Sequence, residues 1–521
     1  MSVGRVVAIC AVLLSAAPVA FGQPPAEEAA SGPYVPRSEY ERLKQDFEAL
    51  KEQVAQLRQR ASTAADAHVP QALQAPEQAA PTDAKSRQPA GGVELWPWSP
   101  LTPGWERVRA KGWMGPGRQA SKSVRIARAG GMDLFMGLDT VGRLQYLTQR
   151  HVMDTVGSDS VLPGQLSPGF QTAFGNLSFL ADFDKQMEVY FDVFIADRPH
   201  QDQLQGDEGY ILLRQLPDAL GDAPMANALF DAIDIKAGQF ELDFGDAHYR
   251  RSLNAAVQRN PLIGNYVIDP RDTEIGIEVS SDDGRFPVNW LLGFGSGSDT
   301  EDFQKNHGPS LHGKLWGHPL ERLRTASSIY WVDQAGTPSG SSGRTNLFRA
   351  NRSGGPYAGI LDNSSAPGEV FPVAGKRVLA TQFDATWEGA PVEGYGHIGW
   401  VQDGDTNGNL SGSPRTSWLY YAAEGTYHVT PRLYTALRYS GASALRLVSA
   451  ADSSRDVGSD GLVHRIQLGG GYWLTNTVLL KAEYVYQLYS GFSSDGSQVS
   501  GVDAWRHPHF QGVITEASFA F

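Results

Sequence analysis

The chain has 521 residues, of which 41% are hydrophobic, 19% charged and 10% aromatic, with a formal net charge of −13 at pH 7. The aromatic content excludes a wholly disordered chain, the mean hydropathy of −0.31 excludes a protein of many membrane-spanning helices, and the acidic balance argues against a general nucleic-acid partner. The single cysteine excludes a disulfide framework and a cysteine-based zinc site.

Residues 1–22 have the pattern of a secretory signal peptide. Arg5 precedes an apolar run over Val6–Ala17 that is too short to span a bilayer, and small residues follow at Ala20 and Gly22. The one cysteine, Cys10, lies in the middle of this run, which argues against a lipoprotein cleavage site. We therefore predict an exported, cysteine-free mature chain. A buried N-terminal helix is the alternative interpretation.

The next two segments differ in character. Residues 23–37 are rich in Pro, Ala and Glu and predict a flexible lead, whereas residues 38–60 repeat apolar side chains at spacings of three and four. Ser38 and Glu41 form a capping box at the start of that repeat. About three heptads are marginal alone, so the pattern predicts a coiled-coil helix that joins partner chains; one helix packed on its own protein is the alternative. The heptad positions are Tyr40, Leu43, Phe47, Leu50, Val54 and Leu57.

Residues 61–131 are interpreted as a linker, first rich in Pro, Ala and Gln and then basic and tryptophan-bearing. The basic part, between Trp105 and Arg128, carries seven Lys and Arg residues against one Glu. Such a stretch can contact anionic lipid headgroups or remain a solvated tail, and the sequence favours neither.

From residue 132 to residue 521 the apolar period becomes two, which indicates a long series of amphipathic strands. Polar joins alternate between short and long, and aromatic residues gather at strand ends, as in a transmembrane β-barrel with aromatic girdles. At 16 strands the region allows about 24 residues for each strand and its connection. The expected strands lie near 132–146, 171–183, 187–195, 233–244, 273–280, 286–296, 310–317, 323–333, 376–388, 392–402, 416–429, 432–443, 463–474, 478–488 and 513–521.

The C-terminus supports the same fold class. Val513, Thr515, Ala517, Phe519 and Phe521 alternate, and this ending resembles the closing strand of outer-membrane barrels. We therefore predict an all-β protein: a transmembrane antiparallel β-barrel of about 16 strands in the bacterial outer membrane, preceded by a coiled-coil extension in the periplasm. The apolar stretch 199–232 is expected to be a long connection that folds into the lumen and narrows it, or that packs on a neighbouring subunit.

One part of the barrel region resembles a known family. The stretch from Gly238-Gln239-Phe240 to Phe244-Gly245, followed by Arg250-Arg251 and by Gln258-Arg259-Asn260-Pro261, looks like the corresponding strand and turn of the phosphate-selective porin O/P family. The resemblance implies a 16-stranded homotrimer with loops folded into the lumen, through which small hydrophilic solutes or ions pass, including anions such as phosphate.

The charge balance departs from that family. Residues 129–521 hold 45 Asp and Glu against 28 Lys and Arg, which argues against a strongly anion-selective pore, although selectivity depends on local rings of charge. If the three arginines after the 233–244 strand lie on an inward loop, they create a local positive field. The alternative is that all the basic residues are ordinary lumen residues paired with Asp and Glu. The candidates for a basic, pore-lining path are Arg143, Lys236, Arg250, Arg251, Arg259, Arg438, Arg465 and Lys481.

No hydrolase, metalloprotease or phosphate-loop motif occurs, so we expect no enzyme and no cofactor. One connection matches the first half of a calcium loop, with Asp403, Asp405 and Asn407 as candidate ligands. Pro414 stands where the bidentate glutamate of a complete loop belongs, so a complete site of this type is excluded. A calcium site of low affinity and a plain polar turn both remain open.

Three functions compete. The leading hypothesis is a passive outer-membrane porin for small hydrophilic solutes, embedded in outer-membrane lipid and trimeric. The second is a structural barrel whose basic stretch and heptads tether the membrane to cell-wall polymer. The third is a soluble exported β-rich binding protein. Heat-modifiable gel mobility separates the first two from the third, and single-channel conductance separates the first from the second.

Overall fold

The described part of the chain begins at residue 124. The computed structural model describes residues 124–520 apart from residues 130, 151–165, 167, 172, 184–185, 197–203, 216–229, 231, 252–256, 271–272, 282–287, 298–308, 333–345, 349–356, 358–369, 371–376, 390, 405–415, 449–455, 459–460, 476 and 491–508. The predicted signal peptide 1–22, lead 23–37, coiled coil 38–60 and most of the linker 61–131 therefore lie outside the described residues. Within the described part, no helix is long and apolar enough to cross a membrane.

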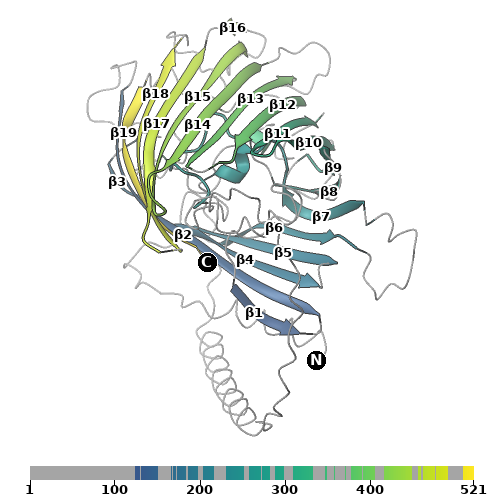
Figure 1. The fold of residues 1–521 in the computed structure, drawn as a ribbon. Coiled ribbons are helices and arrows are strands. Elements are labelled where there is room, and N and C mark those ends of the chain that lie inside the picture. Colours follow the sequence, from purple (N-terminus) through teal and green to yellow (C-terminus); the bar gives the residue numbers. More distant parts are fainter. Residues whose placement is uncertain are drawn as a thin grey trace, which may run out of the picture. The chain divides into compact units, whose positions relative to one another are not determined.

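Sixteen antiparallel strands form a closed ring, in agreement with the predicted fold class (Figure 1). Each ring strand pairs with its neighbours in sequence, and the last, β19, pairs with the first, β2, from His509↔Arg150 to Ala520↔Asp139. The ring strands are β2 (Met132–Arg150), β4 (Phe174–Phe183), β5 (Met187–Ala196), β6 (Leu204–Leu213), β7 (Ile233–Glu241), β8 (Thr273–Ser281), β9 (Val288–Gly295), β10 (Ser310–Leu320), β11 (Leu323–Val332), β12 (Arg377–Trp387), β13 (Val392–Gly404), β14 (Ser417–His428), β15 (Leu433–Val448), β17 (Leu462–Trp473), β18 (Val478–Ser490) and β19 (His509–Ala520).

Three shorter strands lie beside the ring. β1 (Val124–Ala129) forms a hairpin with the start of β2, β3 (Gly169–Phe170) pairs with β2, and β16 (Asp456–Gly458) pairs with β15. Strand pairing therefore begins at Val124, inside the stretch 61–131 that the sequence analysis interprets as linker. Two 3-10 helices, η2 (Ala247–Arg250) and η3 (Asn346–Phe348), belong to the connections β7–β8 and β11–β12.

The polarity of the wall is reversed relative to a water-soluble protein. In β17, Arg465 and Gln467 are fully buried, whereas the neighbouring Leu468 is 56% exposed, and the same alternation is clear in β11, β12, β14, β18 and β19. Charged side chains therefore face the inside of the ring and large apolar ones cover its outside. A continuous apolar outer surface without sheet edges is what a hydrocarbon environment requires.

The connections alternate in length around the ring. Those between β10 and β11, β12 and β13, β14 and β15, and β17 and β18 have two to four residues, whereas the connection between β7 and β8 spans residues 242–272. Apart from the connection between β6 and β7 (residues 214–232), short turns therefore gather at one end of the barrel and long connections at the other. The connection between β11 and β12 starts from the same end as that between β7 and β8.

The prediction for residues 199–232 is wrong in part, because residues 204–213 form wall strand β6 instead of a loop folded into the lumen. Tyr210 and Leu212 are buried inside the ring, and Ile211 between them is 45% exposed on its outside. Two glycines and two acidic residues among the first six residues of this strand obscure the alternation in the sequence. The connection after β7 does enter the lumen.

The inverted wall gives a first prediction. Leu468, at the middle of β17, replaced by Arg should lower the free energy of unfolding in lipid by about 2–4 kcal/mol, because a charge at mid-membrane depth loses its hydration. The matched control is Leu474→Arg in the short turn after β17, where we expect a cost of about 0–1 kcal/mol. Urea unfolding from phospholipid vesicles, followed by tryptophan fluorescence, measures both. Equal costs at the two positions would show that β17 does not cross the bilayer.

Candidate functional site

The connection between β7 and β8 is folded into the barrel. Its described residues, 242–251 and 257–270, are all buried, and we call them the lumenal segment. Their polar groups bind side chains of β10, β11, β12, β14, β15, β17 and β18, which form the wall across the lumen from β7. A connection exposed to solvent would not bury its backbone in this way, so this segment is the candidate site that narrows the lumen.

Two glycines let the chain enter the lumen. Gly238 in β7 has a φ of 136°, and a Cβ there would overlap the backbone of β6. Gly245 has a φ of 67°, and a Cβ there would overlap the amide of Gln382 on β12. Both positions therefore require glycine, for backbone conformation and for close approach. Between them, Phe240 and Phe244 are buried in the main apolar cluster and hold the start of the segment against the wall.

A first set of ion pairs fixes the entry of the segment. Lys314 on β10 donates to Asp243 Oδ1 at 2.5 Å and to the carbonyl oxygen of Gly245 at 2.8 Å, and it pairs with Asp246 at 2.9 Å. Arg324 on β11 also donates to Asp246, at 3.2 Å. Burial disfavours the charged form of Asp246, but Arg324 and Lys314 outweigh it and hold the pKa of this carboxyl below its ordinary value. The aspartate is therefore charged at neutral pH.

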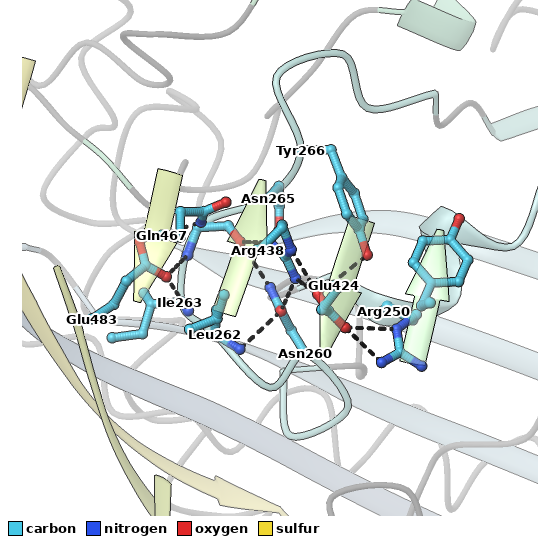
Figure 2. A network of polar contacts seen from close by, with 12 residues as sticks. Arg250, Asn260, Leu262, Ile263, Asn265, Tyr266, Glu424, Arg438, Gln467 and Glu483 are labelled. Carbon is cyan, nitrogen blue, oxygen red and sulfur yellow. Dashed lines mark hydrogen bonds and ion pairs between the residues drawn. The ribbon is translucent and has the colours of Figure 1, made fainter. Parts of the chain in front are cut away.

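A second set of contacts is centred on Glu424 of β14 (Figure 2). One carboxylate oxygen accepts from Arg250 Nη2 at 2.6 Å, and the other accepts from Arg438 Nε at 2.6 Å and from the Tyr266 hydroxyl at 3.4 Å. Burial, strengthened by the charge of Glu424, raises the pKa of Tyr266, so its phenol stays neutral and donates. Two residues of the segment and one of β15 therefore share a single buried carboxylate.

Arg438 also binds the tip of the segment. Its Nη1 donates to the carbonyl oxygen of Gly264 at 2.5 Å and its Nη2 to Asn260 Oδ1 at 2.6 Å. Asn260 in turn accepts from the backbone N–H of Leu262 and donates to Gly264. The guanidinium thus links the wall carboxylate to a turn that the asparagine already stabilises, which is the forked geometry that arginine supplies and lysine does not.

A third set of contacts comes from β18. Lys481 donates to the carbonyl oxygens of Val257, Asn260 and Leu262 at 2.9, 3.3 and 3.1 Å. Glu483 accepts from the backbone N–H groups of Ile263 at 2.7 Å and Gly264 at 2.8 Å. The two wall residues have opposite charge: the lysine ammonium binds carbonyl oxygens of the segment, and the glutamate carboxylate binds its N–H groups. Five backbone groups of the segment therefore have hydrogen-bond partners on the wall.

All eight predicted basic residues lie inside the barrel, each no more than 8% exposed. The structure brings Arg250 and Arg438 together on one carboxylate and does not arrange the eight as a single ladder. Most of them share an ion pair: Arg143 with Glu516 at 2.7 Å, Lys236 with Glu278, Arg250 and Arg438 with Glu424, Arg251 with Asp269 at 3.1 Å, and Lys481 with Glu516 at 2.6 Å. Arg465 donates to Gln487 and to the carbonyl oxygen of Asn265.

The residues predicted from the sequence were all basic and did not include the acidic residues that bind the lumenal segment or form ion pairs within it. Glu424 and Glu483 each bind several groups of the lumenal segment, and Asp246 binds Lys314 and Arg324. Alternation alone places Glu424 and Glu483 on the inner face of their strands, so a signal was present in the sequence. Their partners lie far away in sequence, however, and no pattern identifies them.

The predicted calcium ligands are only partly described. Asp403 lies near the end of β13, whereas Asp405 and Asn407 lie outside the described residues. Among the residues that the structure describes, no group of three or more His, Cys, Asp or Glu side chains is arranged to hold a metal ion. The calcium site stays a prediction.

Comparisons with known proteins give similarities to solved outer-membrane barrels. No protein-family model and no curated protein matches the chain. Solved structures that match include the outer membrane channel DcaP of Acinetobacter baumannii (14% identity, 75% of this chain and 98% of that one, TM-score 0.46). The anion-selective porin from Comamonas acidovorans also matches (11% identity, 75% and 100%, TM-score 0.45), as does OmpT, an outer membrane protein of Vibrio cholerae (10%, 76% and 100%, 0.45). At these values, what the chain does has to be argued from its own residues.

The contacts of Glu424 give a second prediction. Glu424→Gln removes the charge that Arg250 and Arg438 share, and leaving buried charges without their partner costs about 3–5 kcal/mol of unfolding free energy. Glu393→Gln on the adjacent strand is the matched control, because Glu393 forms its ion pair with His428 at 3.3 Å and acts on Arg250 only through its charge, without the direct hydrogen bonds that Glu424 accepts. Urea unfolding in lipid vesicles compares the two. A Glu424 variant as stable as the Glu393 variant would contradict the central role of this carboxylate.

Proposed function

We propose that the protein is a passive diffusion channel of the bacterial outer membrane for small hydrophilic solutes. The observation that carries the proposal is the closed barrel with an apolar outside and a charged inside, narrowed by a segment that the wall holds in place. A lipid-facing wall with a polar interior is the arrangement that passage of hydrated solutes requires. The proposal needs no catalytic group and no cofactor.

Several features support the outer membrane as the location. The predicted signal peptide implies export, and closed antiparallel barrels with short turns at one end and long connections at the other are typical of that membrane. The short turns would face the periplasm, where the N-terminal extension is expected. The lumenal segment then enters the barrel from the outer side, together with the other long connections.

Phosphate or another anion is the finer proposal that the family resemblance adds. Its physical basis would be the arginines of the lumenal segment. Arg250 and Arg251 are, however, paired with Glu424 and Asp269, and paired charges largely cancel beyond a few ångströms. We therefore propose a channel of weak charge preference, for which phosphate is one solute to test.

A structural tether between the membrane and cell-wall polymer is the second candidate. It rests on the heptads at residues 38–60 and the basic stretch between residues 105 and 128, which motivate periplasmic attachment. The homotrimer is an expectation from the same heptads and from the family resemblance. Conductance separates the two candidates: a tether needs no open path, whereas a channel inserted in a planar bilayer must carry ions.

The arginines give a third prediction. Replacing Arg250, Arg251 and Arg259 together by Gln should shift the reversal potential in asymmetric salt towards cations, because their acidic partners lose the opposite charge. The shift should shrink at 1 M salt, where the Debye length is about 3 Å. Arg322→Gln with Arg432→Gln is the control, since both lie exposed in short turns. A triple variant with the parent's reversal potential at low salt would show that these arginines do not act on the path.

A further inference from the structure

Two long connections meet inside the barrel. Besides the lumenal segment, the connection between β11 and β12 contributes buried residues: Leu347 and Phe348 of η3, together with Tyr357 and Val370. The backbone N–H of Val370 donates to the carbonyl oxygen of Val267 at 3.0 Å, so the two connections share a direct backbone hydrogen bond. Phe348 of η3 lies edge-on to Tyr420 of the wall, with ring centroids 6.1 Å apart.

Glu483 of β18 binds both connections at once. Its Oε2 accepts the N–H groups of Ile263 and Gly264 in the lumenal segment, while its Oε1 accepts the Tyr357 hydroxyl at 2.5 Å. The carboxylate is 1% exposed. Burial and the nearby carboxylate together raise the pKa of Tyr357 well above its ordinary value, so the phenol stays a donor. One wall side chain therefore uses one oxygen for each connection.

The two connections also fit tightly against each other at this point. A Cβ added to Gly264 would overlap the Tyr357 hydroxyl and the Gln467 amide, and Gln467 itself donates to both Tyr357 and Glu483 at 3.1 and 3.3 Å. The contact is therefore between the turn of one connection and the side chain of the other, with the wall carboxylate and amide beneath them. Displacing Tyr357 would remove a partner of Glu483 and open space beside Gly264.

We propose that Glu483 is the positioning residue that holds both connections as one unit and so fixes the width of the narrowed lumen. The proposal rests on the proposed channel function. The lumenal segment has other attachments at Glu424 and Lys314, but the Glu483 carboxylate accepts hydrogen bonds from both connections. Without its charge, the two connections lose their shared attachment to the wall and keep the Val370–Val267 backbone hydrogen bond as a direct link, so they shift relative to each other more readily.

Single-channel recordings of Glu483→Gln, Tyr357→Phe and the double variant test the proposal. Losing a hydrogen bond to a charged group lowers the occupancy of the bound state roughly tenfold or more, so each single variant should show about a tenfold rise in transitions between conductance levels. The double variant should resemble Glu483→Gln, because the phenol acts through the carboxylate.

The barrel offers a matched control pair. The Tyr330 hydroxyl donates to Glu274 Oε1 at 2.7 Å, and both are buried residues of wall strands. Glu274→Gln and Tyr330→Phe therefore remove the same chemical groups from a pair of wall residues; Glu274 also accepts the N–H of Gly297 in the connection between β9 and β10, outside the two connections that Glu483 binds. We expect their recordings to match the parent's. Heat-modifiable gel mobility verifies that every variant is folded.

The outcomes distinguish a failure of the proposed channel function from a failure of the proposed role of Glu483. A folded parent that carries no current overturns the channel itself, whatever the variants do. A conducting parent whose Glu483 and Tyr357 variants match the Glu274 and Tyr330 controls overturns the role of Glu483, and so does a double variant whose effects simply add.

If Glu483→Gln does not fold, Gly264→Ala replaces it. This variant keeps every hydrogen-bonding group but forces Tyr357 away, and it must raise the number of transitions between conductance levels. Gly425→Ala, which meets open space, is its control.

Discussion

Charge that is held away from bulk water has to be paired, and this requirement shapes the interior of the barrel. Fifteen Asp and Glu and ten Lys and Arg are buried among the described residues. A lone buried charge is strongly destabilising, whereas a pair with further hydrogen bonds is tolerated. Glu424, which binds two arginines and a tyrosine, shows how the condition is met. The lumenal segment is ordered because its own charges and backbone groups complete those of the wall.

The same requirement explains why the fold was easier to predict than the site. Alternation of polar and apolar residues depends only on which face of a strand each residue occupies, so it can be read locally, and it located most of the wall strands and the class of fold. It failed at β6, where Gly206 and Gly209 carry no side chain to show the alternation. The pairing of Arg250 with Glu424, by contrast, joins residues 174 positions apart. Nothing local in the sequence specifies such a partner.

The stretch from Gly238 to Gly245, which resembles the porin O/P family, has glycines for a physical reason. Gly238 and Gly245 both adopt positive φ values; a Cβ at Gly238 would overlap the backbone of β6, and one at Gly245 would overlap the side-chain amide of Gln382. They lie where the chain runs along the wall and then turns into the lumen. The family resemblance rests in part on these two glycines, and in the structure they determine the course of the backbone. A backbone path does not specify a solute, because selectivity belongs to the side chains that the path brings together.

The pairing of charges also bears on what the interior does to a passing ion. An arginine bound to a carboxylate presents a dipole, whose field falls off faster with distance than that of a free charge. Basic residues that are used to hold the lumenal segment are therefore poor candidates for a continuous attractive path, even though all of them face inward. Their main effect is structural: they donate to backbone carbonyl oxygens and acidic side chains and so hold the lumenal segment in place. The field that acts on an ion then depends on the local excess of one charge over the other. Among the buried, described residues the acidic side chains outnumber the basic ones.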